Sequence, residues 1–133
     1  MSGYAGYFAG KVGARSYVTV SDRNAKTNVH SIDGRDLLAR VSGLPITTWD
    51  YKADLNKHHV GPMAQDFHAA FGLDGDDDRH INLVDLAGVS LAAIQELDRQ
   101  VKQQDAQIAE LKSQIAALAA MLSSRTAALE NQR

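Results

Sequence analysis

Residues 91–122 read "LAAIQELDRQVKQQDAQIAELKSQIAALAAML" and decide the fold of the chain, because their apolar side chains recur every three or four residues. With Ile94 at position a of a heptad, eight of the ten a and d positions through Arg125 are aliphatic. The predicted seam consists of Ile94, Leu97, Val101, Gln104, Ile108, Leu111, Ile115, Leu118 and Leu122. The stripe is narrow, which favours a parallel coiled coil between copies of the chain over one helix packed on its own domain.

The seam alone does not fix the number of chains in this coiled coil. β-Branched residues at a with Leu at d favour two strands in parallel coiled coils, so the pattern leans weakly toward a dimer. Gln104 is a polar residue inside the seam, where it can fix the register of the helices at some cost in stability.

The composition changes along the chain. Eight of the ten glycines lie before residue 73, with both prolines and every aromatic residue, whereas the last forty residues contain none of these. At 133 residues the chain is long enough for one domain. We therefore expect an α+β fold, in which a small mixed domain with short strands and helices precedes a long C-terminal helix. The expected divisions are residues 1–20, 21–90 and 91–129.

The first part of the chain predicts strands and then a helix. Residues 7–12 and 16–20 combine Tyr, Phe and Val, which predicts two short strands joined at Gly13. Such a pair cannot bury itself alone and resembles the end of something longer upstream. The stretch "SIDGRDLLARVSGL", residues 31–44, predicts a helix capped by Ser31 or Asp33 and ending at Gly43.

The middle of the chain predicts alternating short elements. Residues 45–53 predict a strand, which is followed by a turn at residues 56–58. A short helix then carries Met63, Phe67 and Phe71 at a spacing of four residues, and an acidic polar loop follows it. A short strand is expected from Ile81, and Asp85 or Ser90 then leads into the last helix.

Several classes of function find no support in the composition. The net charge of −2 gives no basic surface for nucleic acid, and the lack of cysteine excludes disulfides and thiolate chemistry. The N-terminus lacks a signal-peptide pattern, and no apolar run reaches the ~18 residues that a membrane span needs. The histidines match no zinc spacing and "DGDDD" lacks the later Glu of a calcium loop, so no metal and no cofactor are expected.

The stretch "TVSDRNAKTN", residues 19–28, places a lysine five positions after a serine. A serine hydroxyl is a poor nucleophile until a base accepts its proton, and a lysine amine can do so only when it is neutral. A dry interface between chains would favour that neutral form. Considered by itself, the stretch is interpreted as a plain turn, since Ser-Asp is a common turn pair.

Four segments in this order carry a further signal. They are "SDRNAK" (21–26), "ITTWDYK" (46–52), "HHVGPMAQDF" (58–67) and "INLVDLAGVSLAAIQELDRQV" (81–101). Together they resemble the C-terminal intramolecular chaperone domain of phage endosialidases, tailspikes and tail fibres, a self-cleaving module that also occurs in myelin regulatory factor. The first segment is similar to the family's Ser-Asp-Arg-x-x-Lys box, and the last to its strand that runs into an Ala-Ile-x-Glu-Leu helix.

The resemblance covers about residues 16–122 and has departures. Asp66 stands where Glu is usual, Pro62 and Met63 replace a common aliphatic pair, and Leu86 takes the usual Tyr position. None of these changes touches the Ser-Lys box.

The resemblance implies a homotrimer that guides an upstream β-rich shaft, its folding client, and then cuts itself off before the serine. On this sequence the cut lies between Val20 and Ser21, with Ser21 as nucleophile and Lys26 as base, from the same chain or a neighbour. Candidate supporting residues are Asp22, Arg23, His59, Gln65 and Asp66. The activity would be a single-turnover Ser-Lys autoprotease. The implied setting is phage virion assembly in a host cytoplasm or a fibre at a bacterial cell surface.

Two alternatives stay open at this point. The chain can be a structural trimerisation tip of a tail fibre or surface adhesin that does not cut and stays attached to its fibre. It can also be a transcription-linked module like that of the myelin factor. The near-neutral charge and the absence of a basic stripe argue against direct contact with DNA.

Overall fold

The computed structural model describes residues 6–8 and 10–131 and divides into two compact units, residues 1–31 and 32–133. In the described part of the first unit, one regular element is present, the 3-10 helix η1 at Arg23–Ala25. The second unit contains, in order, α1 (Gly34–Gly43), β1 (Thr47–Tyr51), β2 (Asp54–Gly61), α2 (Ala64–Phe71) and α3 (Leu83–Glu130). The expected α+β class, with short elements followed by a long C-terminal helix, is confirmed.

The strands expected at residues 7–12 and 16–20 are wrong for the residues that the structure describes, a set that leaves out Ala9. The apolar side chains there are exposed, with Val18 at 91% and Val20 at 80%. β propensity reflects how well a side chain fits a pleated, half-buried surface. No strand pairs with this segment in the described chain. Its side chains therefore have no pleated surface to pack on, and their β propensity does not produce a strand.

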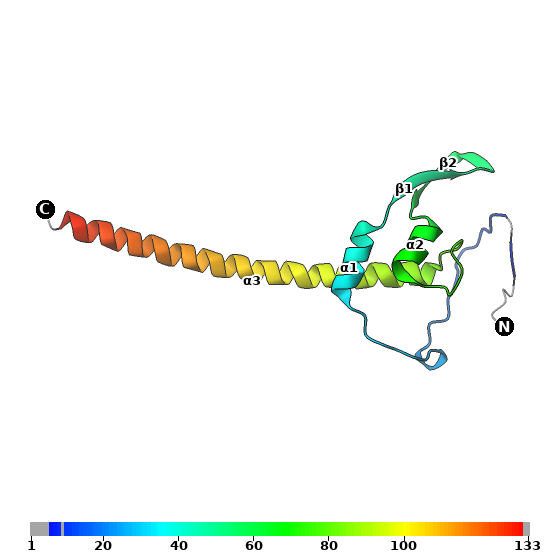
Figure 1. Cartoon of the computed structure of the whole chain (residues 1–133), viewed down its shortest axis with the longest axis horizontal. Helices are drawn as coiled ribbons and strands as arrows, with labels where there is room; N and C mark the ends of the chain where they lie inside the picture. Colours follow the sequence, from blue (N-terminus) through cyan, green and yellow to red (C-terminus); the bar gives the residue numbers. More distant parts are fainter. Residues whose placement is uncertain (1–5, 9, 132–133) are drawn as a thin grey trace. The chain divides into compact units, whose positions relative to one another are not determined.

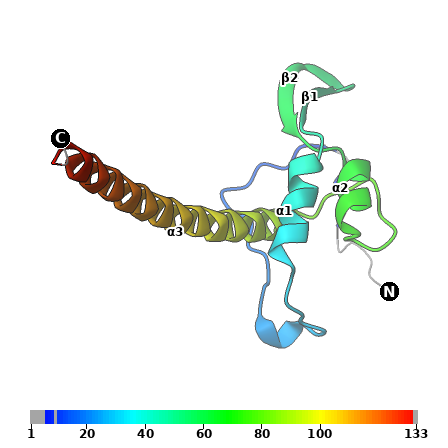
Figure 2. The same cartoon turned by 60° about the vertical axis from the view of Figure 1, so that its left-hand side comes forward.

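Helix α1 begins where its sequence predicts. The Asp33 side chain accepts hydrogen bonds from the backbone N–H groups of Arg35 (2.9 Å) and Asp36 (3.2 Å), which satisfies two donors of the first turn. The helix ends at Gly43, as expected. Figures 1 and 2 both show α1 lying across the first part of α3, with α2 beside it.

Strands β1 and β2 form an antiparallel hairpin in which Trp49 lies opposite His59. The predicted strand at residues 45–53 is confirmed, but the turn expected at residues 56–58 is wrong, because these residues lie inside β2. The chain turns earlier, at Lys52 and Ala53. The polar sequence "NKHH" suggested a loop, yet a two-stranded ribbon can expose such side chains on one face.

Helix α2 carries Phe67 and Phe71, and Met63 is its N-cap residue. It ends at Phe71, and its C-cap residue Gly72 has a φ of 62°, a left-handed conformation that glycine adopts without strain. The polar loop expected after it is present. The short strand expected from Ile81 is wrong, because Asn82 caps α3 by accepting a hydrogen bond from the Val84 N–H at 3.0 Å. The last helix therefore begins at Leu83 rather than at Asp85 or Ser90.

The hydrophobic core of the second unit is small. Its buried members are Leu37 of α1, Phe67 of α2, and Val89 and Ala93 of α3. Partly buried side chains surround them, namely Leu38, Val41, Leu44, Phe71, Leu73, Ile81, Leu86 and Ala92. The core thus joins the two short helices to the first three turns of α3.

Beyond this core, α3 continues for about thirty residues without a packing partner, and every described residue from Val101 onward is exposed. The eight aliphatic side chains of the predicted seam are between 48% and 66% exposed in the single chain. Apolar stripes of this length on a soluble protein mark surfaces that pack against another molecule. In the structure of one chain, the surface that the heptads predict is therefore exposed and can pack against other chains.

Candidate functional site

Ser21 and Lys26 are in direct contact within the first unit. The Lys26 Nζ donates a hydrogen bond to the Ser21 Oγ at 2.7 Å. Helix η1 lies between them, and its three residues reverse the chain so that the lysine side chain returns to the serine. The spacing of five positions, which has no fixed meaning in a helix or strand, thus becomes a contact through one tight turn.

Local hydrogen bonds hold this turn. The Asp22 Oδ1 accepts from the Asn24 backbone N–H (3.0 Å) and from the Asn24 Nδ2 (3.2 Å). The Asp22 carbonyl accepts from the Ala25 N–H at 3.1 Å, and the Arg23 carbonyl accepts from the Lys26 N–H at 3.2 Å. Asp22 therefore has a structural part in the turn, and Arg23 contributes a backbone bond.

Every residue from Ser21 to Lys26 is exposed in the single chain. A nucleophile and a base within hydrogen-bond distance satisfy the geometric requirement for general-base activation of the serine. Excluding water would favour the neutral lysine that can accept the proton. Ser21 and Lys26 of a single chain are thus in contact but remain exposed to water.

The other three candidate supporting residues lie in the second unit. His59 is on β2, and Gln65 and Asp66 lie in the first turn of α2. The positive end of the helix dipole stabilises the Asp66 carboxylate there. Their grouping with Ser21 and Lys26 stays a prediction.

His59 belongs to an aromatic cluster that sequence reasoning missed. Its ring stacks on Trp49, with centroids 4.7 Å apart, and meets the edge of Tyr51 at 5.3 Å. The cluster borders an open groove of about 540 Å³, which is also lined by Met63 and Leu83. The Nε1 of Trp49 is buried there and has no hydrogen-bond acceptor among the described residues. The cross-strand pairing that makes the cluster depends on the hairpin register, which the misplaced turn had hidden.

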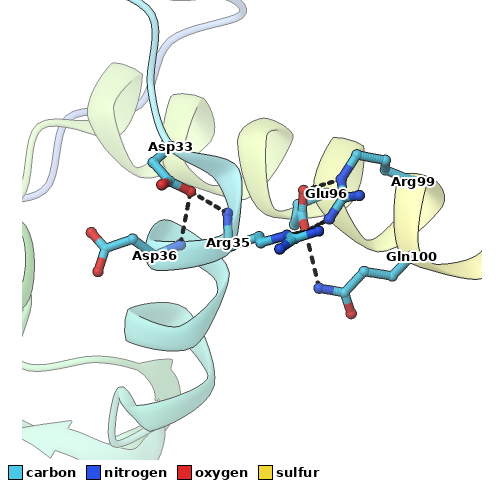
Figure 3. A network of polar contacts seen from close by, with 6 residues as sticks. All are labelled: Asp33, Arg35, Asp36, Glu96, Arg99 and Gln100. Atoms are coloured by element: carbon cyan, nitrogen blue, oxygen red, sulfur yellow. Dashed lines mark hydrogen bonds and ion pairs between the residues drawn. The ribbon is translucent and has the colours of Figure 1, made fainter.

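Glu96 is the second feature that the sequence did not reveal, although it lies in the "IQEL" segment. The side chain is only 6% exposed, between α1 and α3. Its Oε2 accepts from the Arg99 Nε at 2.7 Å and its Oε1 from the Gln100 Nε2 at 3.0 Å, as Figure 3 shows. The Arg35 Nε of α1 lies 3.9 Å from Oε1. Hydrogen bonding to Arg99, the strongest influence, lowers the pKa of Glu96 to about 2.

Gly34 explains how the buried carboxylate fits. A Cβ at this position would come within 3.1 Å of the Glu96 Oε2 and 3.2 Å of the Glu96 Cβ. A larger residue at this position would require Glu96 or α1 to shift by a few tenths of an ångström. The network therefore ties the first turn of α1, which follows the dyad segment in sequence, to the long helix.

The described residues contain no group of three or more side chains that could hold a metal ion. Three histidines have other partners instead. His58 lies 2.7 Å from the Asp50 carboxylate, His80 lies 2.8 Å from Asp77, and His68 contacts the Leu73 carbonyl at 3.0 Å. Among the helices of the described chain, none has the length and apolar character that crossing a bilayer requires.

Comparison with known proteins gives a family match for part of the chain. Residues 21–74 match the model of the family described as chaperone of endosialidase. The match begins at Ser21 and includes η1, α1, the hairpin and α2. A search of the curated proteins gives no significant match.

Proposed function

We propose that this chain, whose residues 21–74 belong to the chaperone of endosialidase family, is a trimerisation chaperone that releases itself by one self-cleavage between Val20 and Ser21. Its client is a β-rich fibre or tailspike region upstream in the same polypeptide. The chain trimerises through the seam of α3 and thereby brings three upstream segments together. Cleavage follows assembly and leaves the folded client behind.

The observation that carries the cleavage step is the 2.7 Å contact between the Lys26 Nζ and the Ser21 Oγ, at the first residue of the family match. The Ser21 Oγ attacks the carbonyl carbon of Val20, and Lys26 accepts the hydroxyl proton. The bond between the Val20 carbon and the Ser21 nitrogen breaks, and the proton passes to the departing amine. Water then hydrolyses the Val20–Ser21 ester, which restores the hydroxyl and leaves a Val20 carboxylate.

The exposure of the dyad connects cleavage to assembly. In a single chain, Ser21 and Lys26 are exposed to water. Packing of three chains would remove water from this segment and favour the neutral base. Cutting would then report that the trimer has formed, whether Lys26 serves its own chain or a neighbour.

The assembly step draws on the exposed seam. Burying the exposed half of each aliphatic side chain contributes about 1 kcal/mol by area, and each chain offers eight of them. The cost of association is several kcal/mol or more, so a surface of this size can sustain an oligomer.

Intact mass after expression tests the cleavage. We expect a fragment that begins at Ser21 for the wild-type chain, and an uncut chain for Ser21→Ala and Lys26→Ala. Ser16→Ala is the matched control, because this exposed serine also lies near the cut, and it should cut normally. A wild-type chain that forms trimers but stays whole would contradict self-cleavage and favour the structural tip. Normal cutting in Lys26→Ala would remove Lys26 from the mechanism.

A further inference from the structure

We propose that Asp22 and Asn24 are positioning residues for the cleavage, because they fold the turn that sets the Lys26 amine against the Ser21 hydroxyl. This inference rests on the proposed self-cleavage. It assigns Asn24 a role that the sequence did not suggest, and it gives the candidate supporting residue Asp22 a defined action. Neither residue reacts, since each acts through the placement of Lys26.

The turn at residues 21–26 is not stabilised by buried side chains. Every residue from Ser21 to Lys26 is exposed, so no packed side chain fixes the position of the lysine. A lysine side chain has many rotamers, and an unsupported one would leave the serine most of the time. The hydrogen bonds inside the turn are therefore what selects the conformation in which the dyad is in contact.

Asp22 makes two of these bonds through one oxygen. Its Oδ1 accepts from the Asn24 N–H at 3.0 Å, which closes the turn at its start, and from the Asn24 Nδ2 at 3.2 Å, which fixes the side chain. The backbone bonds from Ala25 to Asp22 and from Lys26 to Arg23 then complete one tight turn. Lys26 is the C-cap residue of this turn, so these hydrogen bonds fix the position of its Cα and the direction in which its side chain leaves the backbone.

The variants separate the two bonds. Asp22→Ala removes both acceptor contacts and should slow cleavage about 10-fold, whereas Asn24→Ala keeps the backbone bond and should slow it about 3-fold. Asp22→Asn keeps a side-chain oxygen that can accept the same N–H, so its rate should stay within about 3-fold of wild type. Thr27→Ala, next to the lysine, is the matched control and should cut at the wild-type rate.

A second readout does not depend on cutting. In the protein as expressed, whether cut or uncut, NMR should show magnetisation transfer between the Ser21 Hβ and Lys26 Hε protons in the wild type and in Asp22→Asn. Asp22→Ala should lose this signal while sedimentation shows an unchanged oligomer. Rescue by Asn, together with loss of the contact in Ala, is what a positioning role requires and what a general effect on folding would not produce.

Two results would overturn the proposed positioning role of Asp22. One is an Asp22→Ala chain that cuts as fast as the wild type. The other is an Asp22→Ala chain that cuts slowly while the Ser21–Lys26 signal persists, since Asp22 would then act in another way. An uncut wild-type chain is a different failure, because it removes the cleavage itself and with it any positioning role, whatever the NMR signal shows.

Discussion

At the scale of single residues, the most informative contacts join groups that the sequence places close but does not connect. The Lys26 amine reaches the Ser21 hydroxyl only because a one-turn helix reverses the chain between them. Glu96 and Gly34 are a second case, in which a buried carboxylate occupies the space that a Cβ would need. Both arrangements depend on local geometry that spacing alone does not specify.

Glu96 predicts how stability responds to acid. Its pKa is about 2 in the folded protein and near 4.5 as an ordinary glutamate, so the unfolded chain binds the proton more readily. The stabilisation is therefore complete above pH 4.5 and is lost as the pH falls toward 2. We expect the urea midpoint of the wild type to fall over this range more than that of Glu96→Gln.

The comparison of these two chains at each pH isolates Glu96 from the other carboxylates. Glu110→Gln is the control, because Glu110 is an exposed residue of the same helix that bonds only Gln114 among the described residues. It should follow the wild-type pH dependence. Equal acid sensitivity in the wild type and Glu96→Gln would show that the buried network does not contribute.

Gly34 predicts a steric effect. Gly34→Ala would normally favour a helix, but the new Cβ meets the Cβ and Oε2 of Glu96 at 3.2 and 3.1 Å. We expect a loss of about 1–2 kcal/mol in the free energy of unfolding, measured by denaturant titration. Gly43→Ala, at the other end of α1, has open space and should gain about 0.5 kcal/mol. A stable Gly34→Ala protein would show that α3 moves away at little cost.

At the scale of elements, α3 has two separate surfaces. Val89, Ala93 and Glu96 face the short helices, whereas the seam that starts at Ile94 is exposed along the rest of the helix. The heptad pattern identified the second surface. The first was hidden, because it extends over only three turns and includes a glutamate.

The seam predicts the effect of a charge placed in it. Leu111→Asp puts a carboxylate at a d position in the middle of the predicted coiled coil, and its desolvation should shift the protein to monomers at micromolar concentration. Ser113→Asp places the same charge at position f, away from the seam, and should keep the wild-type oligomer. Sedimentation velocity distinguishes the two, and an unchanged Leu111→Asp oligomer would mean that α3 does not join the chains.

Gln104 is expected to lower the stability of the predicted coiled coil while it fixes the register of the helices. Gln104→Leu replaces the polar seam residue with the side chain that the d position prefers, so the melting temperature at fixed concentration should rise. Ser113→Leu, outside the seam, should leave it unchanged. A lower melting temperature for Gln104→Leu would show that the glutamine makes stabilising contacts across the bundle.

The elements were predictable where a side chain signals the boundary on its own. Asp33 and Gly43 mark the limits of α1, and the composition of residues 47–51 marks β1. The failures were at boundaries that pairing decides. The turn at Lys52 and Ala53 has neither Gly nor Pro, and the cap at Asn82 lies inside the stretch from Ile81 that predicts a strand.

At the scale of the whole molecule, the chain combines a small core with a long exposed helix. Four buried residues form that core, whereas eight aliphatic side chains of the seam are half exposed. The predicted seam thus leaves a long apolar stripe exposed outside the core. Ser21 and Lys26 likewise meet within one chain, and the proposed cleavage needs neighbouring chains to exclude water from them.

Native mass spectrometry of the expressed chain tests this account most directly, because one spectrum gives both the number of chains and where each begins. We expect trimers at micromolar concentration whose chains start at Ser21. A folded, uncut monomer under these conditions would contradict both the assembly through α3 and the cleavage that depends on it.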